Sequence, residues 1–183
     1  MKNKTFALIS VKVFSTSGLE QMKQVVKEIV SKFEINRISS VYSVSRTAES
    51  LQGLRDIKKE ETLQGLSAVL RVQTQEIPKI VLSVIGNIEL KLQKEILNKS
   101  VSCNLLVYGN EVSMLPELSL PHPEFHLRPE EVIPAAEIWP EYVHPVLNLN
   151  LSELSRQFQN QEWGEFFTQG SQLLPQKASE LDF

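Results

Sequence analysis

The chain of 183 residues has the length of one domain, or of one domain with an appendage, and its 42% hydrophobic and 22% charged residues exclude a disordered or fibrous protein. The formal net charge of −3 argues against a nucleic-acid binder that neutralises phosphates, because such proteins carry a basic excess. The single cysteine, Cys103, cannot form an internal disulfide, and no run of 18 apolar residues predicts a membrane span. We therefore expect a cytoplasmic protein.

The first part of the chain has the patterns of a strand, a helix and a second strand. Residues Thr5–Val13 are apolar and β-branched, which is typical of a strand. Ser17 and Glu20 have the spacing of a capping box, which predicts that a helix begins there. An apolar stripe follows at helical spacing, formed by Leu19, Met22, Val25, Val26, Ile29, Val30 and Phe33. Residues Arg37–Ser45 are rich in strand formers, and the charged segment Thr47–Glu61 is expected to be a loop.

The next part repeats this order of elements. Apolar residues alternate along Leu66–Val72, which predicts a strand, and Pro78 suits the first turn of a second helix. The apolar stripe of this helix would consist of Ile77, Ile80, Val81, Val84, Ile85, Ile88 and Leu92. Val101–Tyr108 have the composition of a further strand, which Gly109 and Asn110 would close. The order strand, helix, strand, strand, helix, strand predicts a ferredoxin-like α+β fold with helices on one face of an antiparallel sheet.

The composition then shifts, because seven of the nine prolines lie between Pro116 and Pro145. Proline fixes φ and removes an amide donor, so we expect an extended, turn-rich segment that wraps over the body without forming a second core. Residues 151–168 are expected to be helical, with Leu151, Leu154 and Phe158 on one side. Residues 169–183 are expected to be frayed or disordered.

The chain thus divides into a domain of residues 1–154 and a C-terminal extension of residues 155–183, which we expect to be partly disordered. Trp163, Phe166 and Phe167 in the extension have two interpretations. They dock on the core of this protein, or they form an aromatic anchor for a protein partner or a homodimer.

Four segments carry a resemblance to a known family, namely Ser39–Tyr42, Thr74–Glu89, Leu105–Val112 and Leu118–Leu147, the last with the motifs PHPEFHLRP and EYVHP. They resemble hydroxymethyldihydropterin pyrophosphokinase, the folate-pathway enzyme that transfers a diphosphate group from ATP to a pterin alcohol. The likeness covers roughly residues 5–154. It implies a ferredoxin-like fold, which agrees with the order of elements.

The resemblance also implies a metal site. The family needs two carboxylates two residues apart on one strand, where they face the same side and hold a pair of Mg²⁺ ions against the triphosphate. Here those positions are Ser102 and Asn104, whose neutral oxygens are poor replacements. A loss of ~4 kcal/mol of transition-state stabilisation lowers a rate ~1000-fold. We therefore expect an impaired or inactive relative with no cofactor, or with ATP and magnesium if the activity persists.

The nucleotide side of the family site is better preserved. The resemblance places His122 and Arg128 at positions that approach the ATP phosphates, and Leu105 and Ser119 at positions near the nucleotide. A structural interpretation stays open, in which the imidazole only completes a Pro-His-Pro turn and Arg128 anchors the segment to a carboxylate.

The pterin side is degenerate. Ser67 stands where the family has an asparagine that recognises the pterin, and Glu130 replaces an aromatic residue that stacks on the ring. A carboxylate does not stack on a heterocycle and is costly to desolvate there.

Other residues have simpler interpretations. His122 and His126 have the spacing of a zinc pair on a helix, but the neighbouring prolines argue against a helix. Cys103 should be a buried, inert thiol beside Val101, Leu105 and Val107. Glu130 and Glu131 are expected on a solvated face.

Three functions remain open. The chain is a nucleotide- or pterin-binding module without turnover, an interaction protein that has kept only the scaffold, or an active diphosphotransferase with altered metal ligands. We favour the first two over the third.

Overall fold

The computed structural model describes residues 4–15, 17–46, 63–96 and 101–175. The strands of the main sheet are β1 (Thr5–Phe14), β2 (Glu34–Ile38), β3 (Val41–Arg46), β4 (Leu63–Thr74), β5 (Val101–Tyr108) and β8 (Glu165–Thr168). They form a six-stranded antiparallel sheet in which β5-β1-β4-β3-β8 is one path and β2 pairs with β4 beside it. The predicted α+β fold is confirmed, while the predicted loop at residues 47–61 lies outside the described residues.

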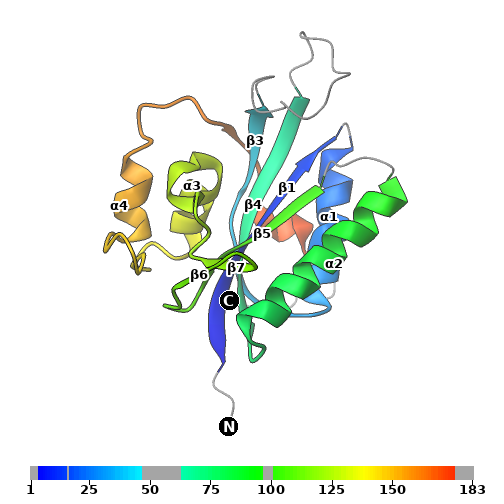
Figure 1. Ribbon diagram of the computed structural model, residues 1–183. Coiled ribbons are helices and arrows are strands. Elements are labelled where there is room, and N and C mark those ends of the chain that lie inside the picture. Colours follow the sequence, from blue (N-terminus) through cyan, green and yellow to red (C-terminus); the bar gives the residue numbers. More distant parts are fainter. Residues whose placement is uncertain (1–3, 16, 47–62, 97–100, 176–183) are drawn as a thin grey trace.

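Helices cover both faces of the sheet. The helices are α1 (Gly18–Val30), α2 (Pro78–Ile96), α3 (Pro129–Ile138) and α4 (Leu151–Arg156). In Figure 1, α1 and α2 lie on one side of the sheet, and α3 and α4 lie on the other. The expectation of helices on one face only is therefore wrong. Leu8, Val69 and Leu106 project from the second face, and their apolar side chains require a cover of their own.

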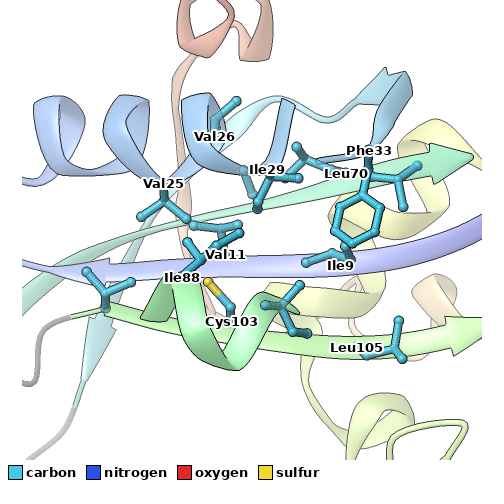
Figure 2. Close-up of a cluster of buried hydrophobic side chains, with 14 of the residues drawn as sticks. Ile9, Val11, Val25, Val26, Ile29, Phe33, Leu70, Ile88, Cys103 and Leu105 are labelled. Atoms are coloured by element: carbon cyan, nitrogen blue, oxygen red, sulfur yellow. The ribbon is translucent and has the colours of Figure 1, made fainter. Parts of the chain in front are cut away.

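The first core lies between the sheet and α1 and α2. Figure 2 shows Val25, Val26 and Ile29 of α1 above Ile9 and Val11 of β1. The predicted stripe of α1 is confirmed, because its members are buried or packed against this core. The predicted capping box is wrong, because the side chain of the N-cap residue Ser17 makes no capping hydrogen bond. The Gln21 amide group instead donates to Ser17 Oγ at 3.1 Å.

Helix α2 begins at Pro78, as predicted. The stripe is confirmed from Val81 onward, but Ile77 and Ile80 are 58% and 43% exposed. They lie before and within the first turn of the helix, outside the core.

The predicted strand at Arg37–Ser45 is two strands, β2 and β3. The break occurs at Ser39, whose N–H donates to the Val69 carbonyl while its Oγ accepts from the Val69 N–H, both at 2.9 Å. The two strands therefore pair with successive stretches of β4.

The proline-rich segment forms a second hydrophobic cluster. It contains the hairpin of β6 (Ser113–Leu115) and β7 (Leu118–Leu120), a 3₁₀ turn at Phe125–Leu127, and α3. Phe125, Val132, Ala135 and Ile138 are buried against the second face of the sheet. The prediction of an extended wrap without a second core is wrong. Pro129 opens α3, a position where a proline costs no hydrogen bond.

The C-terminal extension joins the main sheet. Helix α4 ends at Arg156, so the prediction of helix to residue 168 is wrong, although Leu151, Leu154 and Phe158 are buried together as predicted. Strand β8 then pairs with β3, and Leu173 in the following 3₁₀ turn at Gly170–Leu173 is 2% exposed. The expected disorder is therefore wrong for residues 169–175.

Candidate functional site

A cavity of about 260 Å³ lies between β5, β7 and α2. The predicted nucleotide residues Leu105, Ser119 and His122 line it, together with Asn104. The remaining lining residues are Leu82, Pro116, Glu117, Leu118, Leu120 and Pro123. Four of the positions that the sequence singled out thus share one small cavity, although they come from β5, β7 and the turn that follows.

His122 is held at the cavity by its backbone and its ring. Its N–H donates to the Leu106 carbonyl at 2.8 Å, and its Nδ1 accepts from the Glu124 N–H at 3.4 Å. Burial lowers the pKa of His122 below 6.5, although the Glu131 carboxylate acts in the opposite direction. The imidazole is therefore neutral at neutral pH. It can form a hydrogen bond, but it lacks the positive charge that would attract a phosphate.

Arg128 does not line the cavity. Its Nη2 pairs with Glu124 Oε2, and its Nη1 lies 3.8 Å from Glu131 Oε2. Both carboxylates belong to the same proline-rich segment as Arg128, so these ion pairs are local to that segment.

The face that β1 and β5 turn toward α3 holds a buried ion pair. Ser10 lies opposite Asn104 and Lys12 lies opposite Ser102 in the antiparallel register. Glu131 Oε1 accepts from Ser10 Oγ at 2.9 Å and from Asn104 Nδ2 at 3.4 Å, and it lies 2.9 Å from Lys12 Nζ. Glu131 has no exposed surface, so the expected solvated face is wrong for this residue. Because α3 packs on the sheet, its first turn lies against Ser10 and Lys12.

The two degenerate pterin positions meet at the same place. Ser67, which is fully buried, donates from its Oγ to the Glu130 carbonyl at 2.9 Å. The Glu130 side chain, 27% exposed, accepts from Lys12 Nζ at 3.1 Å. Neither side chain is free to face a ring as the family positions would require.

The residues present do not fit a pair of divalent cations. Ser102 and Asn104 bring no charge, and the Asn104 amide nitrogen points toward Glu131 as a donor. The two nearby carboxylates already share the ammonium group of Lys12. Within the described residues, no cluster of three or more His, Cys, Asp or Glu side chains is arranged to hold a metal.

The sequence analysis missed Ser10, Lys12 and Glu131 as members of this site. One feature of the sequence could have indicated this site. Lys12 lies inside the apolar strand Thr5–Phe14, and a buried lysine needs a carboxylate partner. The sequence did not show which carboxylate that would be, since Glu130 and Glu131 lie more than 110 positions away.

Cys103 is 7% exposed, and burial raises its pKa to about 12, with Glu89 adding to the effect. The prediction that this thiol is buried is confirmed, and Figure 2 shows Cys103 among the side chains of the first core. Its predicted neighbour Val107 instead belongs to the second cluster, because a register shift between β1 and β5 pairs Leu8 with Val107 and Ile9 with Leu105. In the part of the chain that the structure describes, no helix is both long and apolar enough to cross a membrane.

No protein-family model matches the chain. A curated relative, the 2-amino-4-hydroxy-6-hydroxymethyldihydropteridine pyrophosphokinase of Aquifex aeolicus, is 27% identical over 132 residues, which are 70% of this chain and 76% of the relative. This relative confirms the resemblance that the sequence motifs carry.

Solved structures of Plasmodium falciparum HPPK-DHPS share the fold. The wild-type protein with pteroate has a TM-score of 0.66 and 15% identity over 86% of this chain and 43% of that one. A second wild-type structure has a TM-score of 0.63 and 14% identity over 86% of this chain and 45% of that one. The chain thus spans less than half the length of these proteins.

Proposed function

We propose that this chain is a divergent member of the hydroxymethyldihydropterin pyrophosphokinase family that binds a nucleotide but transfers diphosphate poorly or not at all. The observation that carries the proposal is the uncharged pair Ser102 and Asn104 on β5, at the positions where the family resemblance requires two carboxylates. The relative from Aquifex aeolicus supports the family assignment.

The composition of the cavity indicates which part of a nucleotide it would accept. Leucine and proline side chains form most of its wall, and Asn104, Ser119 and His122 supply hydrogen-bonding groups. Its one carboxylate, Glu117, has a pKa below the usual value, first through its own backbone and then through Lys79. This carboxylate pairs with Lys79 Nζ at 3.2 Å, so the described lining residues offer a triphosphate no unpaired positive charge. We infer that the cavity binds the base and sugar, while the phosphates add little affinity.

The test is calorimetric titration with ATP and with adenosine, in the presence and absence of MgCl₂. We expect similar affinities for both ligands and no enhancement by Mg²⁺. The variant His122→Ala should weaken binding about 10-fold, which corresponds to ~1.4 kcal/mol for one lost hydrogen bond. His126→Ala is the matched control, because His126 does not line the cavity.

Turnover is measured as AMP release from ATP in the presence of a hydroxymethylpterin. We expect no magnesium-dependent release above background. The double variant Ser102→Asp with Asn104→Asp adds two carboxylates to this face and should give magnesium-dependent ATP binding. Release of AMP by the wild-type protein would instead establish the active diphosphotransferase with altered metal ligands.

A second candidate function is association of two copies through the extension. Trp163 docks on this protein's own Tyr42, with ring centroids 5.0 Å apart, but Phe166 and Phe167 are 58% and 49% exposed. Both lie on β8, which ends the described path of the main sheet. Light scattering should show a dimer that Phe166→Ser with Phe167→Ser abolishes, while Leu90→Ser, at another exposed position, preserves it.

A further inference from the structure

Lys12 is a buried ammonium group between two carboxylates. Its side chain is 10% exposed, and its Nζ lies 2.9 Å from Glu131 Oε1 and 3.1 Å from Glu130 Oε1. Burying a charge is costly unless counter-charges and hydrogen bonds compensate for the lost hydration. Here Lys12 directly contacts two anions that come from consecutive positions of α3 and would otherwise repel each other.

The groups around Lys12 Nζ are oxygen donors of the kind that hard divalent cations prefer. Two carboxylates lie in contact with it, Ser10 Oγ bonds one of them, and Ser102 lies directly across from Lys12 in the sheet. A further oxygen, Glu131 Oε2, is buried and has no hydrogen-bond partner among the described residues. The nearest cation to this oxygen is Arg128 Nη1 at 3.8 Å, beyond hydrogen-bond distance, so the face has more anionic oxygen than Lys12 satisfies.

We propose that Lys12 is the built-in cation of this face and that its ammonium group excludes divalent cations from it. An uncharged residue at position 12 leaves two adjacent carboxylates, one fully buried, without a cation in direct contact, because Arg128 pairs closely with Glu124 and its Nη1 stays 3.8 Å from Glu131 Oε2. The cluster then becomes a site for Mg²⁺ or Mn²⁺. This inference rests on the proposed function, in which the family's metal site is lost. It adds that Lys12 is the group that keeps metal ions away from this face.

The experiment is a titration with MnCl₂ at constant ionic strength, followed by calorimetry and by electron paramagnetic resonance of the free ion. The wild-type protein should take up no specific Mn²⁺. Lys12→Met, which keeps an unbranched side chain of similar length, should take up about one equivalent. Lys23→Met is the matched control, because Lys23 pairs with the exposed carboxylate of Glu20 and, within the described ranges, with no second carboxylate. It should behave as the wild type.

Thermal unfolding supplies a second readout. Mn²⁺ at about 100 times its dissociation constant should raise the midpoint of Lys12→Met by on the order of 5–10 °C and leave that of the wild type unchanged. If Lys12→Met does not fold without metal, circular dichroism is followed as MnCl₂ is added. Folding that depends on MnCl₂ supports the proposal, and failure to fold at every concentration overturns it.

The double variant Lys12→Met with Glu131→Gln distinguishes Mn²⁺ binding at this site from non-specific Mn²⁺ binding by other carboxylates. It should lose the Mn²⁺ uptake, because the buried anion is gone. Uptake by the wild type as tight as that of Lys12→Met, or persistent uptake by the double variant, overturns the proposal. The result is independent of the AMP assay, so active turnover by the wild type would remove the proposed function and leave the metal titration to decide the role of Lys12.

Discussion

Glu131 is the buried carboxylate on which the face between β1, β5 and α3 depends. Replacing it with glutamine leaves Lys12 buried with only Glu130 as a counter-charge. We expect Glu131→Gln to lower the free energy of unfolding by roughly 3 kcal/mol, the effect of breaking a buried ion pair. Urea unfolding measures this effect.

The matched control is Glu20→Gln, which removes an exposed ion pair with Lys23 and should change the stability little, since water screens such pairs. Equal effects of the two substitutions would contradict the assigned role of Glu131.

His144 couples the stability of the second cluster to pH. It is 4% exposed, and its Nδ1 accepts from the N–H groups of Val146 and Leu147 at 3.3 Å. Burial, and then the neighbouring His126, lower the pKa of His144 below its ordinary value of 6.5. The unfolded state therefore binds a proton more readily than the folded state.

The resulting stability is present above pH 6.5 and is lost as the pH falls from 6.5 through the lower pKa of the folded state. Urea midpoints should decrease between pH 7.5 and pH 5.5. The decrease should be smaller in His144→Asn, whose side-chain oxygen retains an acceptor for the same N–H groups. An unchanged decrease in this variant would assign the pH dependence to other groups.

At the scale of elements, the 3₁₀ turn that follows β8 packs against the backbone between β2 and β3 and requires glycine at position 170. A Cβ at Gly170 would overlap the backbone carbonyl of Ser39, and backbone atoms cannot move aside as a flexible side chain can. Gly86 in α2 has open space around its Cβ position.

We therefore expect opposite effects from two alanine substitutions. Gly170→Ala should destabilise the protein by about 2 kcal/mol or more, the scale of overpacking. Gly86→Ala should stabilise it by roughly 0.5–1 kcal/mol, because alanine favours the helix. Thermal midpoints of both variants test this prediction, and a neutral Gly170→Ala would show that the turn after β8 packs loosely.

At the scale of the whole molecule, the end of the described chain completes the first core. Leu173 packs into the cluster under α1, more than 140 positions after the residues of that helix. Leu173→Ala should lower the free energy of unfolding by about 3 kcal/mol, as for other buried leucines. Leu90→Ala, at a position that is 55% exposed, should have little effect. Denaturant unfolding compares them, and similar values would mean that the extension is not part of the cooperative unit.

The first core was largely predictable from the sequence, because the patterns that form it are local. Each of these patterns lies within one element. They are the apolar stripe of α1, the alternation in β4 and the proline at the start of α2. No sequence pattern predicted the cavity. The family resemblance singled out Leu105, Ser119 and His122, which line it, and spacing alone identifies none of them.

The order of the elements from β1 to β5 was predictable from the sequence, except for the division into β2 and β3, as were the core-facing side of α1 and α2 and the uncharged residues Ser102 and Asn104. The tertiary structure decided that α3 covers the second face, that β8 joins the sheet, and that Lys12 is buried against Glu130 and Glu131. The physical reason is the range of the interactions. A periodic stripe is local, whereas the burial of a charge depends on which distant segment packs over it and supplies the opposite charge.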